Sequence, residues 1–255
     1  MCGVCFSRRG LLAALGAVGL AGCSENAATG RRQLVFVDDG QLATLADRTW
    51  NEVVAKIPPV ADPAAQARLA RIGAPLVKAA GRDDLDWSFT VLDSPEFNAF
   101  VLPNGRVGFF RGLMEFARDD GAIASVVGHE IGHVLARHSA ERMSQEIAVQ
   151  AGVGIAQLLI SQEAGQYADE IGAALGAGAV LGVILPYSRK HELEADRVGV
   201  DLMRKAGQDP NDAVRFWERM IRRAQNTERP PEVISTHPAD TRRLEALKAA
   251  VARPA

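Results

Sequence analysis

Cysteine is scarce in this sequence: its 255 residues include only three, Cys2, Cys5 and Cys23. All three stand near the start of the chain, so disulfides cannot be the framework of a domain built from the residues that follow. With 47% hydrophobic and 24% charged residues, the composition is instead that of a globular protein held together by a hydrophobic core. The length predicts one such domain.

An excess of charge of one sign is also missing. The formal net charge is -2, and no basic stretch with interleaved aromatic residues occurs in the sequence. Such a chain lacks the electrostatic attraction on which nucleic-acid binding depends. We therefore expect no nucleic-acid partner.

The N-terminal region lacks an apolar run long enough to cross a membrane. Its apolar run, Leu11–Ala21, is roughly half of the ~20 residues that a transmembrane helix requires. A basic pair, Arg8 and Arg9, precedes this run, and Cys23 follows it. This order of basic and apolar residues is typical of an export signal.

The end of the run, Leu20-Ala21-Gly22-Cys23, resembles a bacterial lipobox, in which the cysteine is diacylated and becomes the first residue. Residues 1–22 are accordingly predicted to be an export signal of the lipoprotein type, and residues 23–37 a lipidated N-terminus and tether. This implies a membrane-anchored lipoprotein of the bacterial cell envelope that faces the periplasm, with the outer membrane favoured. The residues around Arg8 also resemble a twin-arginine signal, and a cytoplasmic protein with an apolar N-terminus is the alternative.

Periodicity and capping residues predict a mainly helical domain over residues 38–255. Between Trp87 and Phe110, apolar and polar residues alternate around Pro103-Asn104-Gly105, which predicts a small antiparallel sheet with a hairpin. A glycine- and alanine-rich stretch, 147–185, is expected to be either a buried helical hairpin or a flap that is mobile or dips into a membrane. Helices are expected at residues 38–58, 62–80, 119–135, 191–205, 209–225 and 238–251.

The segment His129-Glu130-Ile131-Gly132-His133 has the pattern HExxH. Two histidines four residues apart on a helix leave the same face about one turn apart, so both imidazoles can bind one metal ion. Glu130 projects beside them, where it can reach a water molecule. The apolar neighbours place this helix in the core, where polar side chains without partners are costly. The pattern therefore predicts a zinc site with His129 and His133 as ligands.

A catalytic zinc ion usually has three protein ligands and an open fourth position. The metzincin arrangement would require glycine at position 136 and histidine at position 139, where this chain has Ala136 and Ser139. The gluzincin arrangement takes a glutamate from a later helix, and residues 191–196 supply Glu192 and Glu194. The sequence excludes the metzincin class and favours a gluzincin.

At this point the chain resembles the Ste-type zinc metallopeptidases, the group of CAAX prenyl endopeptidases and of the Oma, HtpX and BepA-like proteases. The resemblance implies an α+β, predominantly helical zincin (gluzincin) domain with a small antiparallel sheet beside the HExxH helix. The chain would be a stand-alone periplasmic lipoprotein type, without the repeat domain of the BepA-like proteins. The resemblance covers about residues 30–247 and rests on Asn98-Ala99-Phe100, Arg111-Gly112-Leu113, the HExxH helix, Glu192-x-x-x-Asp196, and Thr236-His237-Pro238 followed by Arg243-Leu244.

The resemblance implies roles for residues around the metal. Glu192 is the expected third zinc ligand, and Asp196 the expected hydrogen-bond acceptor behind a ligating histidine. Glu130 would take a proton from the water and pass it to the leaving amine. His237 and Arg243 would stabilise the oxyanion, although His237 could instead be a cap or a fourth, inhibitory ligand.

The resemblance also implies a place for the substrate. Asn98, Ala99 and Phe100 would form an edge strand that binds an extended peptide through backbone hydrogen bonds. An ordinary hairpin strand is the alternative.

Three polar residues near the ligands are expected to take no part in the chemistry. Glu194 points about 200° away from Glu192, at about 100° per residue, and is expected to be a solvated helix residue. His138 falls on a different helix face from the ligands and is expected to be exposed. His191 is expected to be structural.

The expected function is zinc-dependent cleavage of misfolded or unassembled cell-envelope proteins, with one Zn2+ per chain. Unfolded proteins are the expected substrates, and the membrane is a partner through the lipid anchor. The alternative is an envelope assembly factor or holdase with a latent protease site. Because every catalytic position is filled, the sequence favours the enzyme.

Overall fold

The computed structural model describes residues 23–160, 188–226, 237 and 241–253. The predicted export signal, 1–22, lies outside these residues, as does most of the glycine- and alanine-rich stretch 147–185. The described part is mainly helical, as the sequence predicts, and has two small sheets where the sequence predicts one.

The first two helices of the described residues begin at the capping residues that the sequence indicates. The Asp38 side chain accepts hydrogen bonds from the backbone at the start of α2 (Asp39–Lys56). Asp62 does the same for α3 (Pro63–Ala80), which has proline in its first turn and ends at Gly81 in the left-handed conformation, with φ 64°. Side-chain caps satisfy the backbone N–H groups that a helix start leaves without partners.

The central sheet has three strands in the order β3-β5-β4: β3 (Ser88–Leu92), β4 (Ala99–Val101) and β5 (Arg106–Phe110). The predicted hairpin is present, since β4 pairs with β5 antiparallel. The expectation of a wholly antiparallel sheet was wrong, because β3 pairs with β5 parallel. Alternation along a strand determines which face each side chain occupies, but it does not determine the direction of the neighbouring strand.

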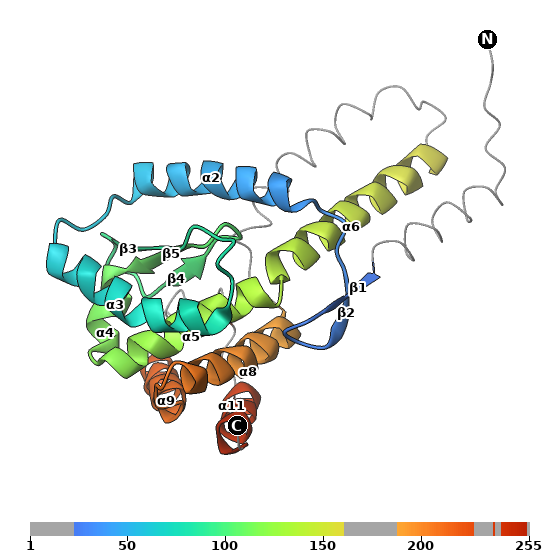
Figure 1. Ribbon diagram of the computed structural model, residues 1–255. Helices are drawn as coiled ribbons and strands as arrows, with labels where there is room; N and C mark the ends of the chain where they lie inside the picture. The colour runs from blue at the N-terminus through green and yellow to red at the C-terminus, as the bar shows by residue number, and fades with distance from the viewer. Residues whose placement is uncertain (1–22, 161–187, 227–236, 238–240, 254–255) are drawn as a thin grey trace, which may run out of the picture.

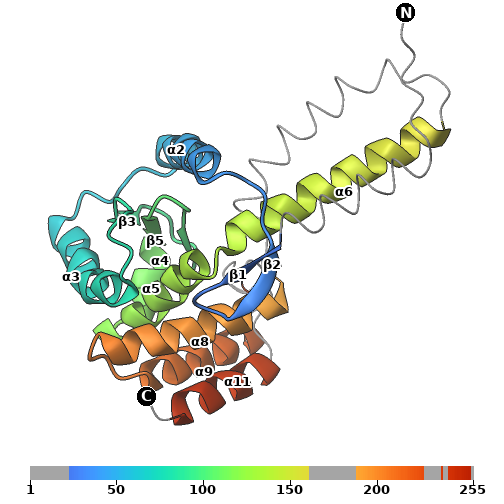
Figure 2. The same cartoon turned by 45° about the vertical axis from the view of Figure 1, so that its right-hand side comes forward.

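The remaining helices build the body of the domain around one central helix, α5 (Asp120–Leu135). In Figure 1, α2 lies on one side of the sheet and α5 on the other. Beyond α5, as Figure 2 also shows, lie α8 (Arg189–Lys205), α9 (Asn211–Gln225) and α11 (Thr241–Ala252). The short α4 (Arg111–Ala117) connects β5 to α5. Buried side chains of the sheet and of these helices, except α2, form the main core, whereas those of α2 pack in two smaller clusters.

Helices α5 and α8 approach each other closely through glycine. A Cβ atom at Gly132 would lie 2.7 Å from the carbonyl oxygen of Ala195. A Cβ atom at Gly199 would lie 3.0 Å from the backbone of both Gly128 and His129. Only glycine, which has no side chain, allows the two backbones to come this close. The close approach brings the HExxH residues of α5 next to Glu192 and Asp196 of α8.

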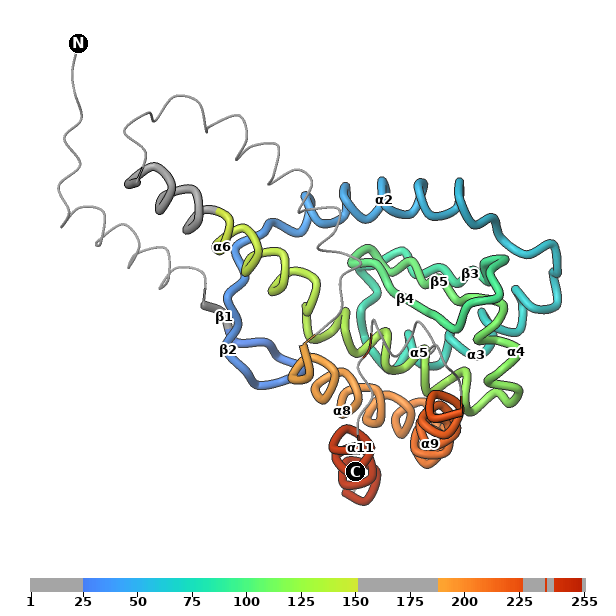
Figure 3. Tube along the Cα trace, turned by 180° about the vertical axis from the view of Figure 1, so that it is seen from behind, coloured from blue at the N-terminus to red at the C-terminus, as the bar shows by residue number. Residues whose placement is uncertain are grey.

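Residues 23–37 are not the free tether that the sequence predicted. Two strands, β1 (Cys23–Asn26) and β2 (Arg31–Leu34), form an antiparallel hairpin, which Figure 3 shows beside α6 and α8. The side chains of Asn26 and Gln33 are buried and donate to the carbonyl oxygens of Leu135 and Ala136, at 3.0 and 2.7 Å. The hairpin thus donates hydrogen bonds to carbonyl groups that the C-terminal end of α5 leaves without partners. These bonds hold the hairpin against the end of that helix.

A long helix, α6 (His138–Ile160), follows α5 and projects away from the body of the domain (Figure 2). Among the described helices, none combines the length and the apolar character that crossing a membrane demands.

Candidate metal centre

The HExxH residues lie on α5, where His129, Glu130 and His133 are all buried. The Nε2 atoms of His129 and His133 are 3.0 Å apart. The carboxylate of Glu192, on α8, has an oxygen 3.4 Å from each of these two nitrogens. The structure therefore brings together the three side chains that the sequence proposes as ligands.

These side chains suit a metal ion. One atom from each of His129, His133, Glu192 and His237 lies within 4.8 Å of all the others. Imidazole nitrogen and carboxylate oxygen are the donors that zinc takes from histidine and glutamate in proteins. The four residues could hold one such ion.

Asp196 and Arg243 surround this group. Asp196 Oδ1 is 2.8 Å from His129 Nδ1, and the Nε of Arg243 donates to Asp196 Oδ2 at 2.6 Å. Arg243 also lies 2.6 Å from a carboxylate oxygen of Glu192. Burial alone would raise the pKa of both carboxyls, but the neighbouring His237 and Arg243 lower the pKa of Glu192 below its usual value, and Arg243 lowers that of Asp196. Both carboxylates are therefore ionised at neutral pH.

Glu130 lies on the same helix as the two histidines and is 2% exposed. Burial raises the pKa of its carboxyl above the usual value. One of its oxygens is 3.5 Å from Nε2 of His237. A carboxyl group with a raised pKa next to a metal site is suited to accept a proton and release it again.

His237 and Arg243 come from a part of the chain that is far from α5 in sequence. His237 Nδ1 is 3.3 Å from His129 Nε2 and 3.2 Å from Glu192 Oε1, so its ring faces the proposed ligands. The guanidinium of Arg243 lies 4.0 Å from the ring centre of Trp217, on α9. Sequence reasoning missed Trp217, since a tryptophan on an amphipathic helix usually indicates only core packing.

The proposed substrate strand lies at the edge of the central sheet, where β4 pairs, among the described strands, with β5 alone. Asn98 and Ala99 are buried, and Phe100 packs between Trp50 and Phe110, with 6.3 Å between ring centres in each pair. Within the described residues, Oδ1 of Asn98 is buried without a hydrogen-bond partner. A buried acceptor of this kind is costly unless something binds it.

Two predictions about polar residues near the site were wrong. His138 is fully buried, not exposed, and Glu194 is an ion-pair partner whose side chain is only 15% exposed. The prediction for His138 assumed that one helix continues through residue 138. In the structure α5 ends at Leu135, and Arg137 turns the chain with a φ of 54°, so the helical period does not reach His138. Glu194 does point away from Glu192, but the N-terminal hairpin covers it, since Arg31 binds its carboxylate.

Comparison with known proteins is consistent with this site. The model of peptidase family M48 matches residues 63–251. The mitochondrial metalloendopeptidase OMA1 of Schizosaccharomyces pombe is 34% identical over 180 residues, which are 71% of this chain and 51% of that protein. The beta-barrel assembly-enhancing protease of Escherichia coli is 29% identical over 211 residues, which are 80% of this chain and 42% of that protein.

The chain thus spans about half the length of these relatives, or less. The family model nevertheless covers most of the chain, including the HExxH helix and the later helix with Glu192. The chain therefore belongs to peptidase family M48.

Proposed function

We propose that this chain is a zinc-dependent endopeptidase that cleaves misfolded or unassembled proteins of the cell envelope. The metalloendopeptidase class follows from the family and the relatives. The single observation that carries the proposal is the placement of Glu130 on the helix that presents His129 and His133, with Glu192 3.4 Å from both histidines.

His129, His133 and Glu192 would hold the zinc ion, which, when bound, supplies a Lewis acid that polarises the peptide carbonyl and acidifies water. Glu130 accepts the proton of the attacking water on its carboxylate and then delivers it to the nitrogen of the departing amine. Asp196 accepts a hydrogen bond from Nδ1–H of His129, which leaves Nε2 free to bind the metal.

Arg243 supports the negative charge that develops in the transition state. Its donors already bind Asp196 and Glu192, so it acts through its positive charge, which is buried with the side chain. It also holds the two carboxylates in place.

The substrate would bind along β4. Its outer edge is not paired within the described sheet, and Oδ1 of the adjacent Asn98 is buried without a hydrogen-bond partner among the described residues. Ala99 and Phe100 would pair with an extended peptide through their backbones, which requires little side-chain recognition. Such binding suits unfolded chains of varied sequence.

The proposed location is the bacterial envelope, with Cys23 as the lipidated residue. One of the relatives is named for its role in the assembly of β-barrels, which supports unassembled envelope proteins as substrates here. Replacement of the thiol in Cys23→Ser is expected to move the protein from the membrane to the soluble fraction of cells. A chain that stays at the membrane would count against the lipid anchor.

The test of the endopeptidase is cleavage of unfolded casein by the purified chain with zinc. Glu130→Gln removes the proton acceptor and is expected to lower the rate by at least about 100-fold. Glu52→Gln, an exposed glutamate on α2, is the matched control and should cleave like the wild type. Equal rates for Glu130→Gln and the control would exclude the proposed mechanism.

A second candidate, an assembly factor or holdase with a latent protease site, is favoured by the position of His237. With His237 the site has four donors, and four protein ligands are typical of closed structural zinc sites, whereas catalytic sites keep one position open. We propose that His237 closes the resting site and must leave before substrate enters.

A further inference from the structure

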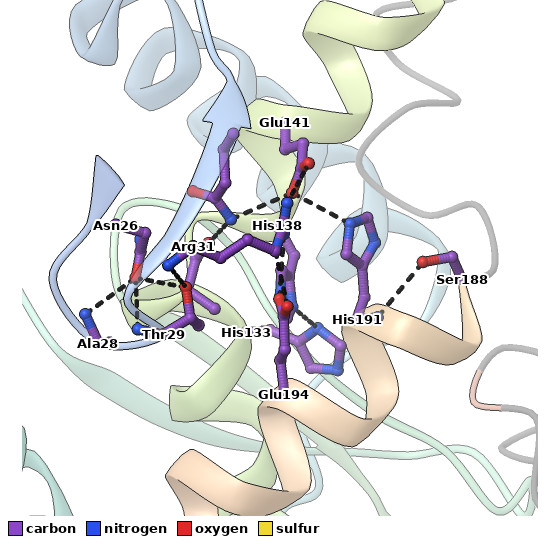
Figure 4. A network of polar contacts seen from close by, with 12 residues as sticks. Asn26, Ala28, Thr29, Arg31, His133, His138, Glu141, Ser188, His191 and Glu194 are labelled. Atoms are coloured by element: carbon purple, nitrogen blue, oxygen red, sulfur yellow. Dashed lines mark hydrogen bonds and ion pairs between the residues drawn. The ribbon is translucent and has the colours of Figure 1, made fainter. Parts of the chain in front are cut away.

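The proposed ligand His133 has a neighbour on the side of its ring that faces away from the metal. Nδ1 of His133 lies 2.9 Å from Nδ1 of His138, the first residue of α6 (Figure 4). If Nε2 of His133 binds a metal ion, its proton is on Nδ1, and His133 is the donor. Nδ1 of His138 must then be the acceptor, which places the proton of His138 on Nε2.

The other side of the His138 ring supports that tautomer. Its Nε2 is 3.1 Å from Oε2 of Glu194, and a carboxylate can only accept. Because Nδ1 of His133 carries a proton, Nδ1 of His138 cannot carry one as well at 2.9 Å, so the proton of His138 is on Nε2, which donates it to Glu194. The hydrogen bonds therefore run in one direction, from His133 to His138 to Glu194.

Arg31 of the N-terminal hairpin holds the end of this chain of hydrogen bonds. It donates from Nε to Oε1 of Glu194 at 2.6 Å and from Nη2 to Oε2 at 3.0 Å. It also donates to Oε1 of Glu141 at 2.7 Å. One guanidinium thus binds two carboxylates, from α6 and α8, as Figure 4 shows. Paired bonds of this kind orient a carboxylate more strictly than a single charge does.

His138 is also held on its face. The ring of His191 stacks on it with 4.3 Å between centres and an angle of 24°. His191 is itself fixed by Glu141, with Nε2 3.2 Å from Oε2. All three of these side chains are buried, so each polar contact is made with little competition from water. The ring of His138 therefore has one orientation, with Nδ1 toward His133.

We propose that His138 is a positioning residue for the metal ligand His133. Arg31 of the N-terminal hairpin supports it indirectly, because Arg31 orients Glu194 and Glu194 orients His138. This proposal rests on the proposed function, because it assumes that His133 binds zinc. His138 would thus accept a hydrogen bond from Nδ1 of His133, as Asp196 does from Nδ1 of His129. Since the hairpin begins at Cys23, the segment next to the proposed lipid anchor is the one that holds Glu194.

The first test compares the zinc affinity of three variants of the full chain, measured by competition with a chromophoric chelator. His138→Asn keeps an acceptor close to the Nδ1 position, whereas His138→Gln places its amide near the Nε2 position, and His138→Leu has no polar atom. Loss of a hydrogen-bond partner behind a metal ligand weakens metal binding by about 10–100-fold. We expect that loss in the Leu and Gln variants and affinity close to the wild type in the Asn variant.

The Asn and Gln variants decide the question even if the Leu variant does not fold. Asn binding more tightly than Gln supports the proposal, and equal affinity, or tighter binding by Gln, overturns it. Circular dichroism in chelator shows that the compared variants are folded. The visible spectrum of the Co2+-loaded protein is a second readout, which should change in the Gln variant and remain as in the wild type in the Asn variant. An unchanged spectrum in both also overturns the proposal.

The second test addresses Arg31. Arg31→Lys keeps the charge but cannot bridge two carboxylates as a fork, so zinc affinity should fall by about 10-fold. Arg32→Lys, at an exposed position of the same strand, is the control and should bind like the wild type. If Arg31→Lys also binds like the wild type, the hairpin has no part in the site. If the wild-type chain binds no zinc at all, the proposed function fails first, and this inference with it.

Discussion

Asp196 lies directly behind His129, with Oδ1 2.8 Å from the Nδ1 atom of the ring. The opposite edge of that ring carries Nε2, which is 3.0 Å from Nε2 of His133. Arg243 donates to both carboxylate oxygens of Asp196, at 2.6 and 2.8 Å. The orientation of the His129 ring is thus determined by a carboxylate that is itself held at both oxygens.

The substitution Asp196→Asn should weaken zinc binding. Asparagine at this position would keep the size of the side chain but lose the negative charge that strengthens His129 as a ligand, so zinc affinity should fall by about 10–100-fold. Chelator competition measures this. Asp201→Asn, a substitution on the same helix at a side chain that is 47% exposed, should leave affinity unchanged. A fall of the same size in both variants would show that general charge, rather than contact with His129, is responsible.

Removal of the His237 ring should speed cleavage if it closes the resting site. His237→Ala opens the fourth position near His129 and Glu192, and the rate of casein cleavage should rise. A hydrogen bond from His237 to the oxyanion predicts the opposite result, a fall of about 100-fold or more. Rates measured at saturating zinc separate the two roles, since a weaker metal affinity does not then affect them.

The sequence predicts the part of the site that depends on local geometry. The period of a helix places His129 and His133 on one face, and the cap at Asp119 confirms where that helix starts, since its side chain accepts from Ala122 N at 2.8 Å. The helix bounds around Glu192 follow from the same kind of pattern. The face and the bounds of these helices therefore follow from the local sequence alone.

The sequence fails where neighbours far along the chain decide the outcome. The direction of β3 relative to β5 depends on how the chain crosses between them, and alternation carries no information on it. The environment of Glu194 depends on a hairpin that precedes it by most of the chain. His138 was misplaced because a single turn at Arg137 ends the helical period. That turn has no glycine to mark it.

Gly132 should be essential for the close packing of the two helices that carry the proposed ligands. A methyl group there would lie 2.7 Å from the carbonyl oxygen of Ala195, which is backbone and cannot turn aside. Overpacking of this kind typically costs about 1–3 kcal/mol, so Gly132→Ala should lower both the free energy of unfolding and the zinc affinity. Helix propensity alone predicts the opposite sign, a gain of about 1 kcal/mol.

Urea denaturation of the wild type and of Gly132→Ala shows whether the substitution lowers or raises the free energy of unfolding. A stabilised Gly132→Ala protein would mean that α5 and α8 can separate at no cost.

The network around Arg31 should make the stability of the domain depend on pH through Glu141. Burial alone would raise the pKa of this carboxyl, but hydrogen bonds with Arg31 and His191 lower it from 4.5 to about 2. Because the folded pKa lies below the unfolded one, the ionised carboxylate stabilises the folded state above pH 4.5 and this contribution is lost as the pH falls toward 2.

Glu141→Gln removes the titrating group and keeps its shape. In chelator, the free energy of unfolding of the wild type should exceed that of the variant near neutral pH, and the difference should shrink steadily below about pH 4.5. Urea denaturation at several pH values measures both proteins, with Glu52→Gln, an exposed position, as a control whose difference from the wild type stays small throughout. A difference between wild type and Glu141→Gln that does not change with pH would show that the ionised carboxylate does not contribute, and that Arg31 holds the hairpin through Glu194 alone.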